Sequence, residues 1–367
     1  MKIQLAKHEE MLFALLRAAL KQEKADETFF IACTPEEWNA CYGLAVKQGV
    51  MALAWDGIMT LPVEKLPPRG LKLKWAVAVD DYEKRYKHYC KTIQELSNFY
   101  ASHGIVTVQM KGVGFSSFYP KPSHREGGDI DIYTYSADHS VMSDKEANDL
   151  ADKLMVEQGI EVDFGSEKHS MFIYHGVPIE NHKTFLSVEA LRLAIPVEKA
   201  LHKLVNPSHT TLIDGACNIL TPSMEFNTVF LSFHALQHYG VGLSLHHLCD
   251  WACLLNHVGL HMPENITDKH YLQVVDTFTE FANRFLGTDV PVTCSEDRIE
   301  RMLYEIFHSP FLQGKPRKNL FKILVYKVRH FIYFYRIWKE LTGEPIYKAV
   351  FNSIIRHIRK PETILHV

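Results

Sequence analysis

Two aspartates separated by one isoleucine, Asp129 and Asp131, lie in a short run from Gly127 to Ile132. Side chains alternate along a β-strand, so both carboxylates share one face while the isoleucines face a core. Carboxylates held this close repel each other by about 1–4 kcal/mol, depending on the effective dielectric constant. A divalent cation between them removes that repulsion, and Mg²⁺ prefers oxygen ligands together with substrate phosphates. The run therefore predicts a metal-binding strand.

A third acid follows in the segment 177–182, which we expect to be the second strand of a hairpin that turns at His175-Gly176. Glu180 and His182 share one face of this strand. If the strand lies beside the aspartate strand, three carboxylates meet at one point, as phosphoryl transfer by two metal ions requires. The alternative is a solvent-facing Glu180 on an edge strand.

A Lys-Gly pair precedes these acids. Lys111 and Gly112 follow a β-branched segment, 105–108, that reads as a strand, and they open a short helix through Phe118. Glycine allows the backbone to approach a phosphate closely, and free N–H groups at a helix start bind anions. Lys111 or Ser116 is placed to assist such binding.

Together these residues resemble the uncharacterised nucleotidyltransferase branch of the DNA polymerase β-like superfamily, and the likeness spans roughly residues 90–260. The branch has a helix, a short strand and then a fixed order of small motifs, followed by an acid-x-His element and a His-containing helical region. In this sequence the matching motifs are Lys111-Gly112, Tyr119-Pro120, Arg125, Gly128-Asp129-Ile130-Asp131, Glu180-Asn181-His182, Phe233-His234-Ala235 and the segment 245–250.

The resemblance implies that Asp129 and Asp131 bind two Mg²⁺ ions, with Mn²⁺ as an alternative, and that Glu180 is the third ligand. It also implies that the loop at Gly112 contacts a nucleoside triphosphate. The residues expected at the nucleotide are Lys111, Gly112, Ser116, Arg125, Gly128 and His182.

Two features depart from the superfamily pattern. Gly112 is followed by Val113 where serine is usual, so the hydroxyl contact is absent or moved to Ser116 or Ser117. The segment 121–124 is an insertion between the glycine and the aspartates. Both departures concern the position of the triphosphate more than the metal site.

The leading hypothesis is a metal-dependent nucleotidyltransferase that moves a nucleoside monophosphate group from an NTP to a hydroxyl-bearing acceptor. One alternative is a catalytically silent module of the same fold that binds a nucleotide or partner as a regulator. Another is a glycosyltransferase with an Asp-x-Asp motif, which would place a doubly wound nucleotide-binding half before Asp129. No motif names the acceptor: a sugar, a protein, a small antibiotic-like molecule or RNA all remain open.

The order of the expected helices and strands that position these residues indicates an α+β fold with a small mixed β-sheet and flanking helices. We expect a helical region over 1–95, a nucleotidyltransferase-like core over 96–220 and a helical domain over 221–367. Thr34-Pro35-Glu36-Glu37 has the composition of a helix start. The last region is basic: twelve Lys or Arg stand against two Glu between residues 315 and 360, which favours an anionic acceptor. An apolar stripe on its helix around 321–338 is expected to pack, leaving a solvated basic face.

Composition is that of a cytoplasmic globular protein: of 367 residues, 47% are hydrophobic and 23% charged, with a net charge of −3. No apolar run is long enough to span a bilayer. Seven irregularly spaced cysteines argue against a disulfide framework, and Cys249 and Cys253 are expected to be buried thiols. The remaining possible ligands are His234, His238, His246, His247 and Asp250. They lack the adjacent His-Asp pair that His-Asp phosphohydrolases use. We therefore expect the histidines to line a helical core or to reach the nucleotide. Asp250 is expected to be a buried partner of a cation or of a helix end.

Overall fold

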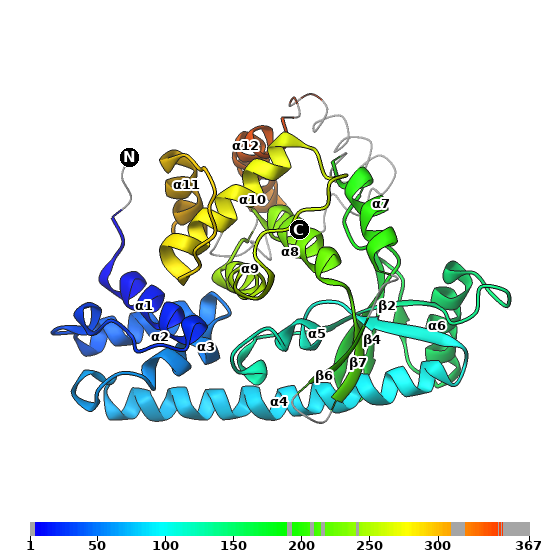
Figure 1. Cartoon of the computed structure of the whole chain (residues 1–367), viewed down its shortest axis with the longest axis horizontal. Helices are drawn as coiled ribbons and strands as arrows, with labels where there is room; N and C mark the ends of the chain where they lie inside the picture. The colour runs from blue at the N-terminus through cyan, green and yellow to red at the C-terminus, as the bar shows by residue number, and fades with distance from the viewer. Residues whose placement is uncertain are drawn as a thin grey trace.

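The computed structural model describes residues 4–188, 193–205, 209–213, 217–239, 242–309 and 320–343, with positions 345 and 347. Helices and strands follow one another in the order shown in Figure 1. The helices are α1 (Lys7–Lys21), α2 (Pro35–Lys47), α3 (Met51–Ile58), α4 (Arg69–Ala101), α5 (Val113–Ser116), α6 (Asp144–Glu157), α7 (Ala194–Leu204), α8 (Met224–His238), α9 (Leu245–Val258), α10 (Lys269–Phe281), α11 (Glu296–Phe307) and α12 (Leu320–Thr342). The strands are β1 (Ile105–Gln109), β2 (Ile130–Ser136), β3 (Val162–Asp163), β4 (His169–Tyr174), β5 (Val177–His182), β6 (His209–Ile213) and β7 (Cys217–Thr221).

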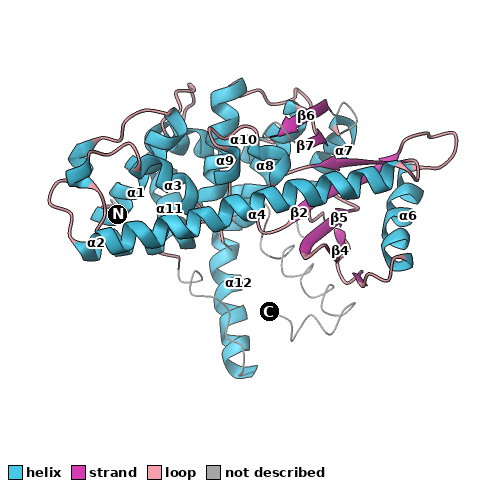
Figure 2. Cartoon of the chain, turned by 90° about the horizontal axis from the view of Figure 1, so that it is seen from below, coloured by secondary structure: helices cyan, strands magenta, loops and turns pink. Residues whose placement is uncertain are grey.

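The strands form one mixed sheet in the order β3-β4-β5-β2-β1-β7-β6. At its centre β1 is antiparallel to β2 and parallel to β7, and β2 is parallel to β5. The hairpin expected at His175-Gly176 is confirmed, since β4 and β5 pair antiparallel on either side of it. The predicted α+β class is confirmed, with helices gathered around this sheet (Figure 2).

Helix α4 is the longest element in the part of the chain that the structure describes, and it runs below both the N-terminal helices and the sheet (Figures 1 and 2). Trp75 and Val79, in its first half, join the core formed with α1 and α3. Ile93, Leu96 and Tyr100, in its second half, are fully buried in a separate core beneath the sheet. One helix thus fixes the sheet relative to the N-terminal helices.

The N-terminal region is helical, as the sequence predicts. Helix α2 begins after Thr34, whose hydroxyl accepts a hydrogen bond from the Glu37 N–H at 3.2 Å. The Glu37 carboxylate in turn accepts from the Thr34 N–H at 2.8 Å, which completes a capping box. The buried side of α1, with Leu12 and Leu16, packs into the same core as helices from the end of the chain.

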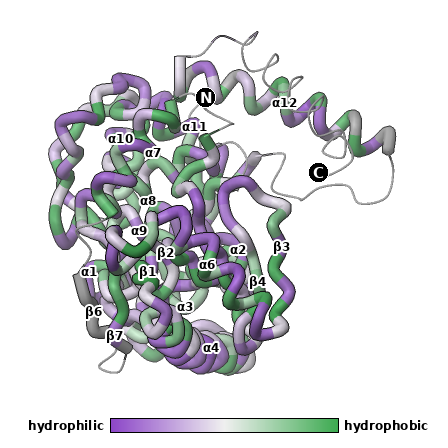
Figure 3. The backbone as a smooth tube through the Cα atoms, turned by 90° about the vertical axis from the view of Figure 1, so that its right-hand side faces the viewer, coloured by the Kyte–Doolittle hydropathy of each residue, from purple (hydrophilic) through white to green (hydrophobic). Residues whose placement is uncertain are grey.

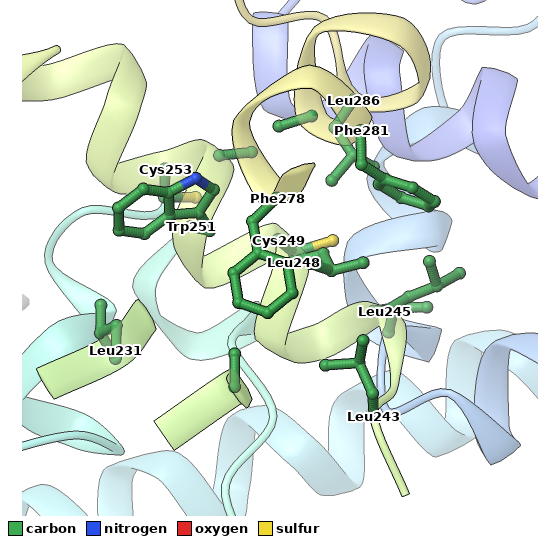
Figure 4. Packing of buried hydrophobic residues seen from close by; sticks show 14 of the residues in the cluster. Leu231, Leu243, Leu245, Leu248, Cys249, Trp251, Cys253, Phe278, Phe281 and Leu286 are labelled. Carbon is green, nitrogen blue, oxygen red and sulfur yellow. The ribbon is translucent and has the colours of Figure 1, made fainter. Parts of the chain in front are cut away.

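Helices α8, α9 and α10 pack together above the sheet and carry several large apolar side chains of the core that they share with the N-terminal helices (Figure 4). Trp251 and Phe278 are almost completely buried there. Cys249 and Cys253 lie in α9 within the same core, so the expectation of buried thiols is confirmed. Burial raises the pKa of both thiols well above the usual range, which makes them poor metal ligands.

Helix α12 extends away from the body of the molecule, as Figures 2 and 3 show. Ile337, Trp338 and Leu341 are buried near its end, where it contacts α10. Val328 and Ile332, earlier in the helix, are more than half exposed, at 51% and 53%. The expected packing of the stripe is therefore confirmed at Trp338 and wrong at Val328 and Ile332, because only the end of the helix contacts α10. Most of the basic segment beyond residue 343 lies outside the described residues. In the part of the chain that the structure describes, no helix combines the length and apolarity needed to cross a membrane.

Candidate active site

The acids meet where the parallel strands β2 and β5 run side by side. Asp131 pairs in register with Glu180, and such neighbours point to the same face of a sheet. One ligand atom each of Asp131, Glu180 and His182 lies within 4.8 Å of the other two. Asp129, directly before β2, lies outside this close group and lines the adjacent cavity. Ile130, on the opposite face, is fully buried, as the alternation predicts.

Glu180 does not lie on an edge strand. Strand β5 is hydrogen-bonded to β4 on one side and to β2 on the other. The Glu180 side chain is 20% exposed, and its Oε2 lies 3.4 Å from His182 Nε2. The alternative of a solvent-facing edge residue is therefore wrong, because the strand order places this acid inside the sheet.

Asp131 has one satisfied oxygen and one unsatisfied oxygen. Its Oδ1 accepts a hydrogen bond from His182 Nε2 at 2.9 Å and lies 3.2 Å from Lys111 Nζ. Its Oδ2 is buried and has no hydrogen-bond partner among the described residues. Leaving a buried polar atom unpaired costs about 1–3 kcal/mol, or more for a charged group. A hard divalent cation would satisfy this oxygen, so the residues fit the Mg²⁺ that the sequence predicts.

The charges of the site shift its acids in opposite directions. Burial acts to raise the pKa of Asp131, but Lys111 and the hydrogen bond from His182 outweigh it and hold that pKa well below its usual range. The hydrogen bond from His182 lowers the pKa of Glu180 against its burial. Burial and the neighbouring Asp131 raise the pKa of Asp129. Without a metal, the negative charge of Asp129 is therefore the least well stabilised of the three.

Lys111 compensates much of this negative charge. Burial acts to lower the pKa of its ammonium group, but Asp131, Asp129 and Glu180 outweigh that effect and raise it. The Lys111 side chain is only 18% exposed and points into the acid site. In the metal-free protein the Lys111 ammonium group thus offsets part of the negative charge of Asp131, Asp129 and Glu180.

The loop after Lys111 depends on glycine. Gly112 has a φ of 68° and a ψ of −129°, a conformation that L side chains rarely adopt. A Cβ at this position would lie 3.3 Å from the carbonyl oxygen of Asp129. Ser116, by contrast, is buried, and its hydroxyl lies 2.9 Å from the hydroxyl of Tyr86. The structure therefore places Gly112 beside the acids and Ser116 behind the cavity wall.

Arg125 is held by a residue from the distant helix α9. Its Nε donates to Asp250 Oδ1 at 2.9 Å and its Nη2 donates to Asp250 Oδ2 at 2.7 Å. The hydroxyl of Tyr119 also donates to Asp250 Oδ1, at 2.7 Å. The expectation that Asp250 is a buried partner of a cation is confirmed, and this pair joins the aspartate loop to the C-terminal helices.

A cavity of about 310 Å³ opens beside the acids, within the range of small-molecule binding sites. Its walls combine three cationic side chains with acids, glycines and histidines from five regions of the chain. It is lined by Gly49, Tyr82, Arg85, Lys111, Gly112, Arg125, Glu126, Gly127, Gly128, Asp129, Leu231, His234, His246, His247 and Asp250. Of the residues expected at the nucleotide, all but Ser116 and His182 lie on this wall, and His182 instead positions the acids.

Several residues of the site were missed from the sequence. His169 Nε2 lies 3.6 Å from Glu180 Oε2, and His169 pairs with His182 across the β4–β5 hairpin. Counting outward from the turn at Gly176 would have found that pair. Burial and Lys111 lower the pKa of the adjacent Lys168. Arg85 reaches the cavity from α4, where its guanidinium lies 4.2 Å from the Tyr82 ring centre, and no local pattern marks it.

Comparison with known protein families identifies the family of this chain. The sequence profile of an uncharacterised nucleotidyltransferase family matches residues 34–272, about two thirds of the chain. The chain belongs to this nucleotidyltransferase family. The match begins just before α2, includes the seven strands that the structure describes and ends in α10, so it covers the acids, the cavity and α9 of this nucleotidyltransferase. No curated protein and no solved structure matches the chain.

Proposed function

We propose that this protein transfers a nucleoside monophosphate group from an NTP to a hydroxyl-bearing acceptor at the cavity beside β2. The observation that carries the proposal is the register of Asp131 with Glu180 on neighbouring parallel strands, with Asp129 on the cavity wall. Family membership supports the reaction class. The acceptor oxygen would bond the α-phosphorus, and pyrophosphate would leave with the electron pair of the broken P–O bond. A carboxylate of the site would take the acceptor's proton.

Asp129, Asp131 and Glu180 would hold two Mg²⁺ ions, with Mn²⁺ as an alternative. When bound, these ions supply acidity to the acceptor hydroxyl and neutralise charge on the triphosphate. His182 orients Asp131 through a 2.9 Å hydrogen bond and satisfies its other ring nitrogen on the Thr184 carbonyl at 3.1 Å. The acids therefore need little rearrangement before a metal binds.

The remaining groups bind and orient the nucleotide. Lys111, Arg125 and Arg85 place three positive charges on the cavity wall, where triphosphate oxygens would bind. Gly127 and Gly128 leave room beside the aspartate strand, and a Cβ at Gly128 would meet no atom within 4 Å. The absent serine after Gly112 means that backbone groups and cationic side chains would bind the phosphates.

Two other functions are less well supported. A glycosyltransferase of the Asp-x-Asp type needs a doubly wound nucleotide-binding half before Asp129, yet from residue 4 to Asp129 the structure describes β1 as the only strand. A silent binding module has no use for Glu180, which lies in register with Asp131. The free cysteine thiols of the described residues agree with the cytoplasmic location that we propose.

Thermal unfolding with each NTP, with and without Mg²⁺, tests the proposal. Binding at about 100 times the dissociation constant adds about 2.7 kcal/mol to the stability of the folded state. We expect a Mg²⁺-dependent rise in melting temperature for at least one NTP, and its loss in Asp129→Asn and Glu180→Gln. Asp149→Asn, on the exposed face of α6, is the matched control and should keep the rise.

Three outcomes separate the hypotheses. The absence of any Mg²⁺-dependent shift would contradict the proposal. A shift that survives in Asp129→Asn would place the nucleotide elsewhere. Binding without release of pyrophosphate, across sugar, protein and RNA acceptors, would favour the silent module.

A further inference from the structure

A second group of possible metal ligands is formed by His234, His238 and His247, and two of them, His234 and His247, line the same cavity as Asp129. His234 and His238 are one turn apart on α8, so they share a face of that helix. His247 faces them from the first turn of α9. One ring nitrogen of each lies within 4.8 Å of a ring nitrogen of the other two. Their ring centres are 4.6 Å apart for the pairs 234–238 and 238–247 and 5.5 Å apart for 234–247.

Two of these rings, His234 and His238, lack the hydrogen-bond partners that inward-facing polar groups normally have. The side chains of His234 and His238 make no hydrogen bond to any residue in the described ranges. Both are partly exposed, so they are not apolar filling of the helical core. No hydrogen bond joins the three rings in the described residues, so the nitrogens of His234 and His238 are left to water or to a ligand.

Ser244 orients the third ring. Its Oγ lies 2.7 Å from His246 Nδ1 and 3.1 Å from His247 Nδ1. If the hydroxyl donates to His246 it accepts from His247 Nδ1–H, and the Nε2 lone pair of His247 is then free. In the other tautomer, Nδ1 of His247 accepts a hydrogen bond from the Ser244 N–H at 3.3 Å and Nε2 carries the proton, so metal binding through Nε2 requires the first tautomer. A hydrogen bond of this kind on the distal nitrogen is the usual support of a metal-binding histidine.

The surroundings keep the three rings neutral, which is the form that binds metals. Burial, followed by Lys111 and His246, lowers the pKa of His238 to about 4. Burial and nearby cations also lower the pKa of His234 and His247. The charged groups that face the cluster are Lys111 and Lys168, and no carboxylate is among its ligand atoms.

We propose that His234, His238 and His247 bind one transition-metal ion, with Zn²⁺ the expected ion, separate from the ions of the acid site. Three imidazoles suit Zn²⁺ and its neighbours, whereas Mg²⁺ requires oxygen ligands. Three protein ligands leave a fourth position open, an arrangement typical of catalytic rather than structural zinc sites.

The open position faces the same cavity as Asp129. His234 and His247 line that cavity together with Gly128 and Lys111. An oxygen or nitrogen atom of the acceptor is the ligand that this position would take, and this part of the inference rests on the proposed nucleotidyl transfer. The metal site itself does not depend on it.

Titration with Co²⁺, a coloured substitute for Zn²⁺, tests the site. The protein should be the full chain without an affinity tag, treated with a chelator and dialysed. The Asp129→Asn/Glu180→Gln double variant serves as a background in which the acid site no longer binds metal. We expect one equivalent of Co²⁺ with the visible absorption of four-coordinate cobalt, displaced by one equivalent of Zn²⁺.

Loss of a residue that only hydrogen-bonds a metal ligand lowers metal affinity by roughly 10- to 100-fold, and removing one of the three ligands should weaken Co²⁺ binding by more than that. His234→Ala and His238→Gln test this, and thermal unfolding without metal shows whether each variant folds. His257→Gln is the matched control, because His257 is exposed on α9, the helix of the third ligand His247, and bonds the Phe118 carbonyl at 3.1 Å. Retained binding in both ligand variants, or no absorption in the double-variant background, would overturn the proposal. Neither readout uses an NTP, so failure here is distinguishable from failure of the proposed function.

Discussion

Arg125 and Asp250 form a buried bidentate ion pair that joins the loop before the aspartate strand to helix α9. Both side chains are only 6% exposed, and Tyr119 adds a hydrogen bond to the same carboxylate. The pair closes one wall of the cavity. The position of α9, and with it of His247, is therefore linked to the position of the acids.

Removing one partner of this pair should be strongly destabilising. Asp250→Ala leaves the Arg125 guanidinium buried without its counter-ion, which costs about 3–5 kcal/mol in comparable sites. Urea unfolding of the metal-free protein measures the change. Asp149→Ala, which breaks the exposed pair with Lys145, should leave the midpoint unchanged. Equal effects of the two substitutions would show that the buried pair does not fix α9.

Asp129→Asn should stabilise the metal-free protein while removing metal-dependent nucleotide binding. The folded-state pKa of Asp129 is raised by burial and by Asp131. A carboxyl with a raised pKa favours folding when protonated, and that contribution is lost as pH rises through the folded-state value. At neutral pH its charge is therefore unfavourable, and the amide should raise the free energy of unfolding. Urea unfolding without Mg²⁺ measures this, and a lower midpoint for the variant would contradict it.

Lys111→Met should lower the free energy of unfolding, and the loss relative to wild type should be larger at neutral pH than at acidic pH. The folded-state pKa of Asp131 is depressed, with Lys111 and His182 outweighing its burial. Its stabilising contribution is present above the unfolded pKa of about 3.9 and disappears as pH falls through the folded value. Methionine removes the main attractive charge and reduces that contribution. Unfolding free energies across pH should converge toward acid, and a constant difference would rule out this linkage.

Gly112→Ala should damage both stability and nucleotide binding. A non-glycine residue at this φ costs about 1–3 kcal/mol, and the new methyl group would press on the Asp129 carbonyl. Gly43→Ala is the control, because Gly43 lies exposed in α2 with no atom within 4 Å of an added Cβ. That substitution should raise stability by about 0.5–1 kcal/mol. The two variants are compared by urea unfolding and by the melting shift with Mg²⁺ and NTP.

Much of the acid site is predictable because it rests on short-range rules. The alternation of strand side chains separates Asp131 from Ile130, and the turn at Gly176 sets the strand that carries Glu180. The hydroxyl of Ser116 illustrates the limit, since only the packing of α4 shows that it faces Tyr86. The division of the chain near residues 95 and 220 stays a prediction.

The sequence by itself determined which residues share a strand face, where the hairpin turns and which family the chain resembles. Only the tertiary structure decided that β5 lies next to β2, that Asp250 binds Arg125 and that His247 meets His234 and His238. The physical reason is the range of the interactions. Dihedral preferences and side-chain period act between near neighbours. Contacts between distant segments depend on how whole helices and strands bury their apolar faces, which no local pattern specifies.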